Sequence, residues 1–353
     1  MIWLFFFYIS SLVLTSVCNK CNLPKVYFLI TIGISVLSFF YVPSESADLY
    51  RHFETIKFYG EMGLDWVLEN RCNLNPLTSL LFYVFSFVQE TRLFTSFCTF
   101  VTYGFSLLLL YRASKFYSLN KHLIVLLTMF LLFNWNYLLV ASNCRIFMLY
   151  SIIAYFFYME FVENRSHKTA FVIYIASVFF HYGIMLVIIP RFFMYLYKPT
   201  NKIVYLWAVI LVAFFAYKGV SNYEAILLES VSDKIEGYKE YNVFGTWQFL
   251  NSLACVLLCC FYALKRRIYL VSISKYYILF WCIIVFMFLQ ISNFQVLYRE
   301  SNFVASLSIV MFSCIFRSCN DKGMRQIIKA QSIVTLIYSF VYVYPYMDFI
   351  FII

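Results

Sequence analysis

Long apolar stretches recur from one end of the chain to the other, separated by short polar connections. A helix needs about 20 such residues to cross the hydrocarbon core of a bilayer. Of the 353 residues, 63% are hydrophobic and only 12% are charged, whereas a soluble domain carries about 25% charged residues. A soluble fold of this length could not bury so much apolar surface. The sequence therefore predicts an all-α, polytopic transmembrane bundle.

We expect one transmembrane domain, 1–353, with about ten full spans and two segments that are re-entrant or broken. The segment 76–88 is short, and the segment 170–190 carries His181 and Gly183 in its middle. Non-helical backbone at membrane depth needs protein or a cavity around it. Twelve plain spans are the alternative. The ten full spans are 2–17, 26–42, 93–111, 122–141, 146–162, 203–217, 247–264, 276–292, 303–316 and 330–347.

The distribution of charge predicts the orientation. Basic residues mark cytoplasmic connections in membrane proteins, and here they cluster at Lys20/Lys25, Arg112/Lys115/Lys121, Arg165/Lys168, Lys198/Lys202, Lys265/Arg266/Arg267/Lys275 and Arg317/Lys322/Arg325/Lys329. Most acidic residues lie in two loops, 43–75 and 218–246, which we place outside. Alternation of twelve plain spans would put the basic connection 112–121 outside. The two interrupted segments remove that conflict.

The external loop 43–75 has helical features. Ser44 or Ser46 can cap a helix, and the apolar residues Leu49, Phe53 and Ile56 follow at helical spacing. A second amphipathic stretch, 64–68, precedes the Asn75-Pro76 break. Such helices lie in the membrane interface.

The sequence lacks the motifs of several functional classes of protein. The glycines never form a G-x-G-x-x-G or Walker phosphate loop, and neither D-x-D nor H-E-x-x-H occurs. The net charge of +10 is spread between spans rather than over one face, so nucleic acid is not an expected partner. Glu45, Asp48 and His52 share one helical face, which suits metal ligands but also an ordinary solvated surface. We expect no cofactor and no metal.

Three ionisable residues lie within or at the ends of apolar segments, where charge is costly and is a functional hypothesis by default. They are Arg145, His181 and Arg299. Snorkelling of the arginines to the interface, or a core histidine bonded to a carbonyl, would also explain them. All three fall near the external face on the preferred topology, as do Asp48 and Arg51. Guanidinium groups suit a pyrophosphate, and a carboxylate or imidazole can take a proton from a sugar hydroxyl.

Four short motifs occur in a recognisable order: Asp48-Leu49-Tyr50-Arg51, Asn143-Cys144-Arg145, Phe180-His181 with an apolar run to Pro190, and Tyr298-Arg299. In this order and approximate spacing, over roughly 40–310, the chain resembles the EpsG-like family of polysaccharide polymerases, relatives of the Wzy-type O-antigen polymerases. Cys144 is a departure, since such proteins often have an aliphatic residue there, and glycine is sparse near Asp48.

The resemblance implies a glycosyltransferase of the bacterial cytoplasmic (inner) membrane, for which a GT-C-like helical arrangement is one option. It would move a glycan from undecaprenyl pyrophosphate onto a lipid-linked repeat unit outside the membrane. Asp48 or His181 would be the base, and Arg145 and Arg299 would hold the pyrophosphate. The residues expected to bind substrate are Tyr50, Arg51, Arg71, Asn143, Tyr298 and Glu300. Contact with a chain-length regulator protein is left open.

Two other functions fit parts of the pattern. A flippase for lipid-linked oligosaccharides would need polar residues through the membrane thickness, whereas here they gather towards one face. A membrane acyltransferase that modifies surface sugars also pairs an intramembrane histidine with arginines.

Overall fold

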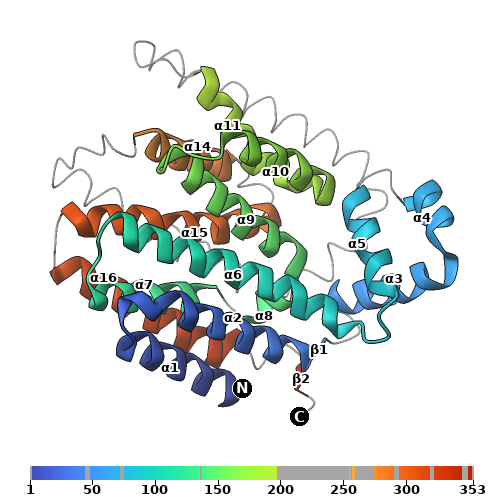
Figure 1. Cartoon of the computed structure of the whole chain (residues 1–353), viewed down its shortest axis with the longest axis horizontal. Coiled ribbons are helices and arrows are strands. Elements are labelled where there is room, and N and C mark those ends of the chain that lie inside the picture. The colour runs from blue at the N-terminus through green and yellow to red at the C-terminus, as the bar shows by residue number, and fades with distance from the viewer. Residues whose placement is uncertain are drawn as a thin grey trace. The chain divides into compact units, whose positions relative to one another are not determined.

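The structure is a computed structural model that describes residues 2–43, 48–71, 75–135, 137–196, 254, 257–258, 274–289, 294–318, 322–343 and 349–351. The predicted span 203–217, nearly all of the span 247–264, the external loop 218–246 and the capping residues Ser44 and Ser46 lie outside these ranges. The described chain is almost entirely helical, so the all-α prediction is confirmed (Figure 1).

Contacts between residues group the chain into two compact units, Met1–Ile184 with Ile309–Ile353 and Met185–Ser308. The single-domain organisation stays a prediction. The helices of the first unit are α1 (Ile2–Val17), α2 (Leu23–Phe39), α3 (Asp48–Met62), α4 (Leu64–Arg71), α5 (Pro76–Ser86), α6 (Arg92–Phe116), α7 (Lys121–Asn134), α8 (Tyr137–Ser142), α9 (Cys144–Phe161), α10 (His167–Phe180) and α16 (Lys322–Tyr338).

Helix α6 is the centre of the first unit and packs against α2 and α9. Its 25 residues rise about 37 Å at 1.5 Å per residue, enough to cross a bilayer core of about 30 Å. The Ser35 hydroxyl in α2 donates to the Ser96 carbonyl in α6 at 2.7 Å. The short helices α3, α4 and α5 gather at the N-terminal end of α6 (Figure 1).

Many buried hydroxyl groups are satisfied within their own helices. Thr15, Thr31, Thr102 and Ser106 each donate to the carbonyl four residues earlier, at 2.7–2.8 Å. This bond removes the cost of an unpaired hydroxyl in apolar surroundings without any partner from another helix. Small polar residues can therefore occupy the interior of a bundle of this composition.

The outward faces of several helices are apolar. On α1 the exposed side chains include Trp3, Phe6, Val13 and Val17, and the outward faces of α2, α10 and α16 follow the same pattern. Contiguous apolar surface of this kind suits lipid rather than water. Within the described residues, three helical stretches are long and apolar enough to cross a membrane, namely Lys20–Phe39, Arg92–Phe116 and Cys144–Phe161.

Some predicted segments differ from the observed helices at their ends. The span 122–141 is interrupted near Trp135, where α7 gives way to α8. The span 330–347 corresponds to α16, which begins at Lys322, and to a π-helical turn, η6 (Ser339–Val343). Hydropathy marks only the apolar part of a helix, and lysine and arginine are good helix formers. The basic residues Lys322, Arg325 and Lys329 consequently belong to α16 rather than to a connection.

The segment 170–190 is broken, as predicted. Helix α10 ends at Phe180, a single 3-10 turn, η2 (Tyr182–Ile184), follows, and α11 (Met185–Leu196) begins immediately after. The backbone of His181 is extended. The segment 76–88 forms the short helix α5. The re-entrant topology of these two segments stays a prediction.

The second unit contains α11, α14 (Ser274–Leu289) and the first part of α15 (Phe294–Ser318). Helices α11 and α14 pack together, and the Tyr276 hydroxyl donates to the Leu307 carbonyl at 3.1 Å. Helix α15 begins before the predicted span 303–316, so Tyr298, Arg299 and Glu300 lie within a helix. Helix α14 (Ser274–Leu289) covers most of the predicted span 276–292.

One short sheet accompanies the helices of the first unit. Strand β1 (Tyr41–Pro43) pairs antiparallel with β2 (Phe349–Phe351), and Tyr41 lies opposite Phe351. Strand β1 follows α2 directly and precedes α3. The pair thus holds the chain just before the segment that carries Asp48.

Candidate active site

Helix α3 forms because its apolar residues fall on one face. Leu49, Phe53 and Ile56 are buried, as their spacing predicts, and this face packs on α5. Asp48 opens the helix, where a carboxylate interacts favourably with the positive end of the helix dipole. The second predicted amphipathic stretch is α4, which ends at Arg71, before the Asn75-Pro76 step. The helical prediction for the loop 43–75 is confirmed.

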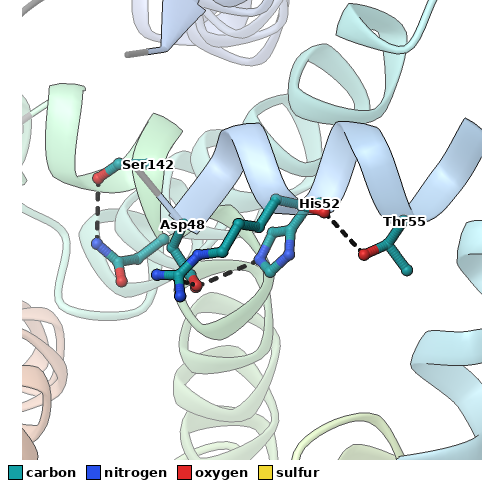
Figure 2. Close-up of polar contacts among 6 residues, drawn as sticks. Asp48, His52, Thr55 and Ser142 are labelled. Carbon is teal, nitrogen blue, oxygen red and sulfur yellow. Dashed lines mark hydrogen bonds and ion pairs between the residues drawn. The ribbon is translucent and has the colours of Figure 1, made fainter. Parts of the chain in front are cut away.

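Asp48 is held from two sides by residues of its own helix. One carboxylate oxygen lies 3.2 Å from the Arg51 guanidinium, and the other lies 3.4 Å from Nε2 of His52. The contact of Asp48 with His52 is drawn in Figure 2, and Ser142 lies on the side of Asp48 away from His52. The Asp48 and Arg51 side chains remain nearly half exposed. The carboxylate is fixed in orientation and still open to a ligand.

His52 is the buried member of this group, with 7% of its surface exposed. Its ring packs against Phe82 of α5 and Phe94 of α6, at centroid distances of 5.3 and 6.5 Å. Burial lowers the pKa of His52 to about 3, and the positive charge of Arg145 acts in the same direction, against the carboxylate of Asp48. Arg51 and His181 lower it further. His52 is therefore neutral at physiological pH, and its Nε2–H can donate to Asp48.

Arg145 reaches the same place from another helix. Helix α8 ends at Ser142, Asn143 is the residue before α9, and Arg145 lies in the first turn of α9. Its guanidinium lies 5.3 Å from the centroid of the Phe82 ring. A cation over an aromatic face is attracted to the ring quadrupole. Phe82 thus contacts both His52 and Arg145.

His181 enters at the break after α10. The Gly183 amide donates to its Nδ1 at 3.1 Å, and the Thr78 hydroxyl of α5 donates to the Phe180 carbonyl. A nitrogen that accepts a hydrogen bond carries no proton, so the neutral ring has its proton on Nε2. The Nε2–H of His181 is consequently a hydrogen-bond donor. A Cβ at position 183 would lie 3.0 Å from this ring, so glycine lets the backbone approach it.

The structure brings together four residues that were predicted for the site from separate segments, namely Asp48, Arg51, Arg145 and His181. His52 lies among them, and its pKa depends on all four. We call these five residues the Asp48 cluster. Asn143 lies beside it and donates to the Ser142 hydroxyl at 3.1 Å. Tyr50 is half-buried on α3.

The other predicted site residues are Arg71, Tyr298, Arg299 and Glu300. The Arg71 guanidinium lies over the Trp66 ring, 5.7 Å from its centroid. Both residues belong to α4. Tyr298, Arg299 and Glu300 belong to the second unit, where Glu300 is buried. The predicted roles of these residues stay predictions.

His52 was not among the predicted site residues. The sequence pattern fitted a metal ligand or part of a solvated face, and the second interpretation is wrong because the ring is buried. The signal was available, since His52 falls at helical spacing within the apolar stripe of Leu49, Phe53 and Ile56. Nothing in the sequence marks Phe82 as a site residue in a chain with 42 phenylalanines.

In the part of the chain that the structure describes, no group of three or more His, Cys, Asp and Glu side chains is arranged to hold a metal ion. Glu45, which shares a helical face with Asp48 and His52 in the sequence, lies outside that part. The cluster offers a carboxylate, two guanidinium groups and a histidine donor. Such a set can bind an anion and accept a proton next to it.

The burial of His52 has a measurable consequence for stability. Its pKa is about 3 in the folded chain and about 6.5 when unfolded, so the unfolded chain binds more protons between these values. Stability therefore falls as pH drops below 6.5, by about 2 kcal/mol from this group at pH 5. We expect a His52→Gln variant to lose that part of the pH dependence, measured as the free energy of unfolding in mixed micelles. His122→Gln, which changes an exposed histidine, should keep the wild-type dependence, and equal profiles for all three proteins would contradict the burial of His52.

Comparison with known proteins finds no matching family model, curated protein or solved structure.

Proposed function

We propose that this chain is a polysaccharide polymerase of the bacterial cytoplasmic membrane. It transfers a growing glycan from undecaprenyl pyrophosphate onto a lipid-linked repeat unit at the external face. The membrane location is supported by the apolar outward faces and by the three helices able to cross a bilayer. About ten spans, with the two interrupted segments, remain the proposed topology.

The observation that carries the proposal is the convergence in the Asp48 cluster. Positions 48, 145 and 181 are far apart in sequence, and all three side chains act electrostatically on one buried histidine, His52. They were selected from the sequence because a carboxylate, an arginine and a histidine suit transfer from a lipid pyrophosphate. Residues that merely snorkel to an interface have no reason to converge.

The chemistry assigns a different role to each group. The guanidinium groups of Arg145 and Arg51 bind the pyrophosphate oxygens and stabilise the charge that develops on them. Asp48 takes the proton from the acceptor hydroxyl, whose oxygen attacks the anomeric carbon. The bond from that carbon to the pyrophosphate breaks, and undecaprenyl pyrophosphate leaves with the electron pair. The Nε2–H of His181 donates to a phosphate or sugar oxygen, which makes Asp48 rather than His181 the base.

The direction of the helices supports an external site. Helix α9 begins at the Asp48 cluster and ends before Arg165 and Lys168, while α6 begins beside His52 and carries Lys115 in its last turn. The cluster and these basic residues are therefore separated by a helix length, about 27 Å for α9. Under the positive-inside rule the basic ends are cytoplasmic. The cluster then faces outward, where lipid-linked repeat units would be polymerised.

Deleting the chain from its native cell tests the proposal through the length of the surface polysaccharide. We expect glycan with a single repeat unit in place of a ladder, and restoration of the ladder by the wild-type chain. Loss of all surface glycan would instead indicate a flippase. An unchanged ladder with altered sugar acylation would indicate an acyltransferase, and either result would overturn the polymerase proposal.

A further inference from the structure

A groove separate from the Asp48 cluster lies between α7 and α16, both in the first unit. Its volume is about 380 Å³. Four of its lining residues carry basic side chains and three are apolar. The residues that line it are His122, Val125, Leu126, Met129, Lys322, Arg325, Gln326 and Lys329. We call it the α7–α16 groove.

The charged residues that line the groove are all basic. Lys322, Arg325 and Lys329 occupy the first two turns of α16, and no lining residue is acidic. Nε of Arg325 is buried and has no hydrogen-bond partner among the residues that the structure describes. Asp321, the acid closest in sequence, is outside those residues. A buried guanidinium N–H without a partner is costly, so an anion in the groove would relieve that cost.

The other wall of the groove is apolar. Val125, Leu126 and Met129 of α7 line it. They continue along the helix from His122, away from its N-terminus, so a ligand with a charged head and a hydrocarbon tail matches both parts. A free anion such as phosphate would leave the apolar wall unused. The groove is therefore amphipathic in the same sense as a phospholipid.

The position of the groove along the helices fits a headgroup. His122 lies in the first turn of α7, and the connection before α7 receives the Lys20 ammonium, which donates to the Leu119 carbonyl at 2.7 Å. Lys20 and Lys115 mark this as the basic end of the unit, which the positive-inside rule places at the cytoplasmic leaflet. Basic pockets between helices on that side bind anionic lipid headgroups.

We propose that the α7–α16 groove binds an anionic phospholipid of the cytoplasmic leaflet. The phosphate lies against Arg325, Lys322 and Lys329, with His122 at the rim, and an acyl chain lies along Val125, Leu126 and Met129. This site depends on membrane location but not on the polymerase proposal. It lies at the end of α7 opposite to the α7–α8 break.

Binding can be measured directly on the purified chain in micelles of a neutral detergent. Phosphatidylglycerol, phosphatidylcholine and inorganic phosphate are titrated separately, and bound lipid is counted by native mass spectrometry beside the thermal unfolding midpoint. We expect phosphatidylglycerol to be retained and to raise the midpoint. Phosphatidylcholine should bind at least tenfold more weakly, and inorganic phosphate should leave the midpoint unchanged.

A double variant, Arg325→Gln with Lys329→Gln, tests the position of the site. Each removed charge contributes to attraction of an anionic lipid, so we expect phosphatidylglycerol affinity to fall about tenfold or more. The matched control is Arg165→Gln with Lys168→Gln, which removes the same charge from exposed positions at the same end of the unit. The control should bind phosphatidylglycerol as the wild type does.

Three results would overturn the proposal. Equal loss of affinity in both double variants would mean general attraction to a basic surface. Equal binding of phosphatidylcholine and phosphatidylglycerol to the wild-type chain would remove the role of the anion. A midpoint shift by inorganic phosphate as large as that by lipid would indicate a site for a free anion. The last two results are obtained with the wild-type chain, so they can contradict the proposal even if the double variant does not fold.

Discussion

Replacing Arg145 with glutamine should reduce glycan transfer by about 100-fold or more and leave surface glycan as single repeat units. The guanidinium is the cluster's cation at the start of α9, and removing one preorganised donor to a developing negative charge costs a factor of 10² to 10³. Arg145→Lys should recover part of the rate, because charge is kept while the two-pronged geometry is lost. The measurement is the rate of repeat-unit addition in isolated membranes, beside the polysaccharide ladder.

Arg92 provides a matched control for this variant. Its guanidinium also lies over a phenylalanine ring, that of Phe39 at 4.8 Å, but it pairs with Glu90 at 2.7 Å. Arg92→Gln should keep the rate within about twofold, as most surface substitutions have small effects. If Arg145→Gln polymerises as well as Arg92→Gln while both are inserted at wild-type levels, Arg145 does not contact the pyrophosphate.

Replacing Asp48 with asparagine should lower the transfer rate by a factor of 10² to 10⁴, the range for loss of a general base. Asparagine keeps the size of the side chain and its contact with His52, so the loss reports chemistry rather than packing. Glu54 is the control, because it pairs with Lys57 on the same helix at 3.0 Å and with the same i to i+3 spacing. Glu54→Gln should leave the rate and the ladder unchanged.

His181 separates the two assignments of the base. Glutamine at position 181 can still donate a hydrogen bond, so His181→Gln should lose only about tenfold if the ring acts as a donor. A loss of 10³ or more in His181→Gln, with activity retained in Asp48→Asn, would reverse the roles. Both variants are compared at equal membrane abundance, which excludes a folding defect as the cause.

Most helices in the described part of the chain follow from local sequence patterns. The stripe Leu49, Phe53 and Ile56 predicts α3 and its buried face. His181 and Gly183 within an apolar run predict the break after α10, because an imidazole and a glycine both disfavour a continuous apolar helix there. These features depend on residues a few positions apart, and such residues are neighbours in any fold that contains the element.

Some features that depend on contacts between distant segments did not follow from the sequence. Phe82 contacts His52 and Arg145 at once, and nothing in its neighbours marks it among so many aromatic residues. The position of Lys322 in a helix was missed for a different reason. When only hydropathy is considered, a polar helical segment resembles a connection between helices. Its backbone hydrogen bonds are nevertheless the same as those of an apolar helix.

The strand pair β1–β2 has a consequence for the order in which this chain is assembled. Tyr41 and Phe351 lie opposite each other in the strand pair, yet nearly all of the chain lies between them in sequence. While the ribosome is still translating, residues 41–43 emerge long before their pairing partners exist. The segment leading into α3 can take its final form only after synthesis has passed residue 351. In a nascent chain that is still being translated, α3 therefore lacks this anchor. The site is completed after the earlier helices have been inserted into the membrane.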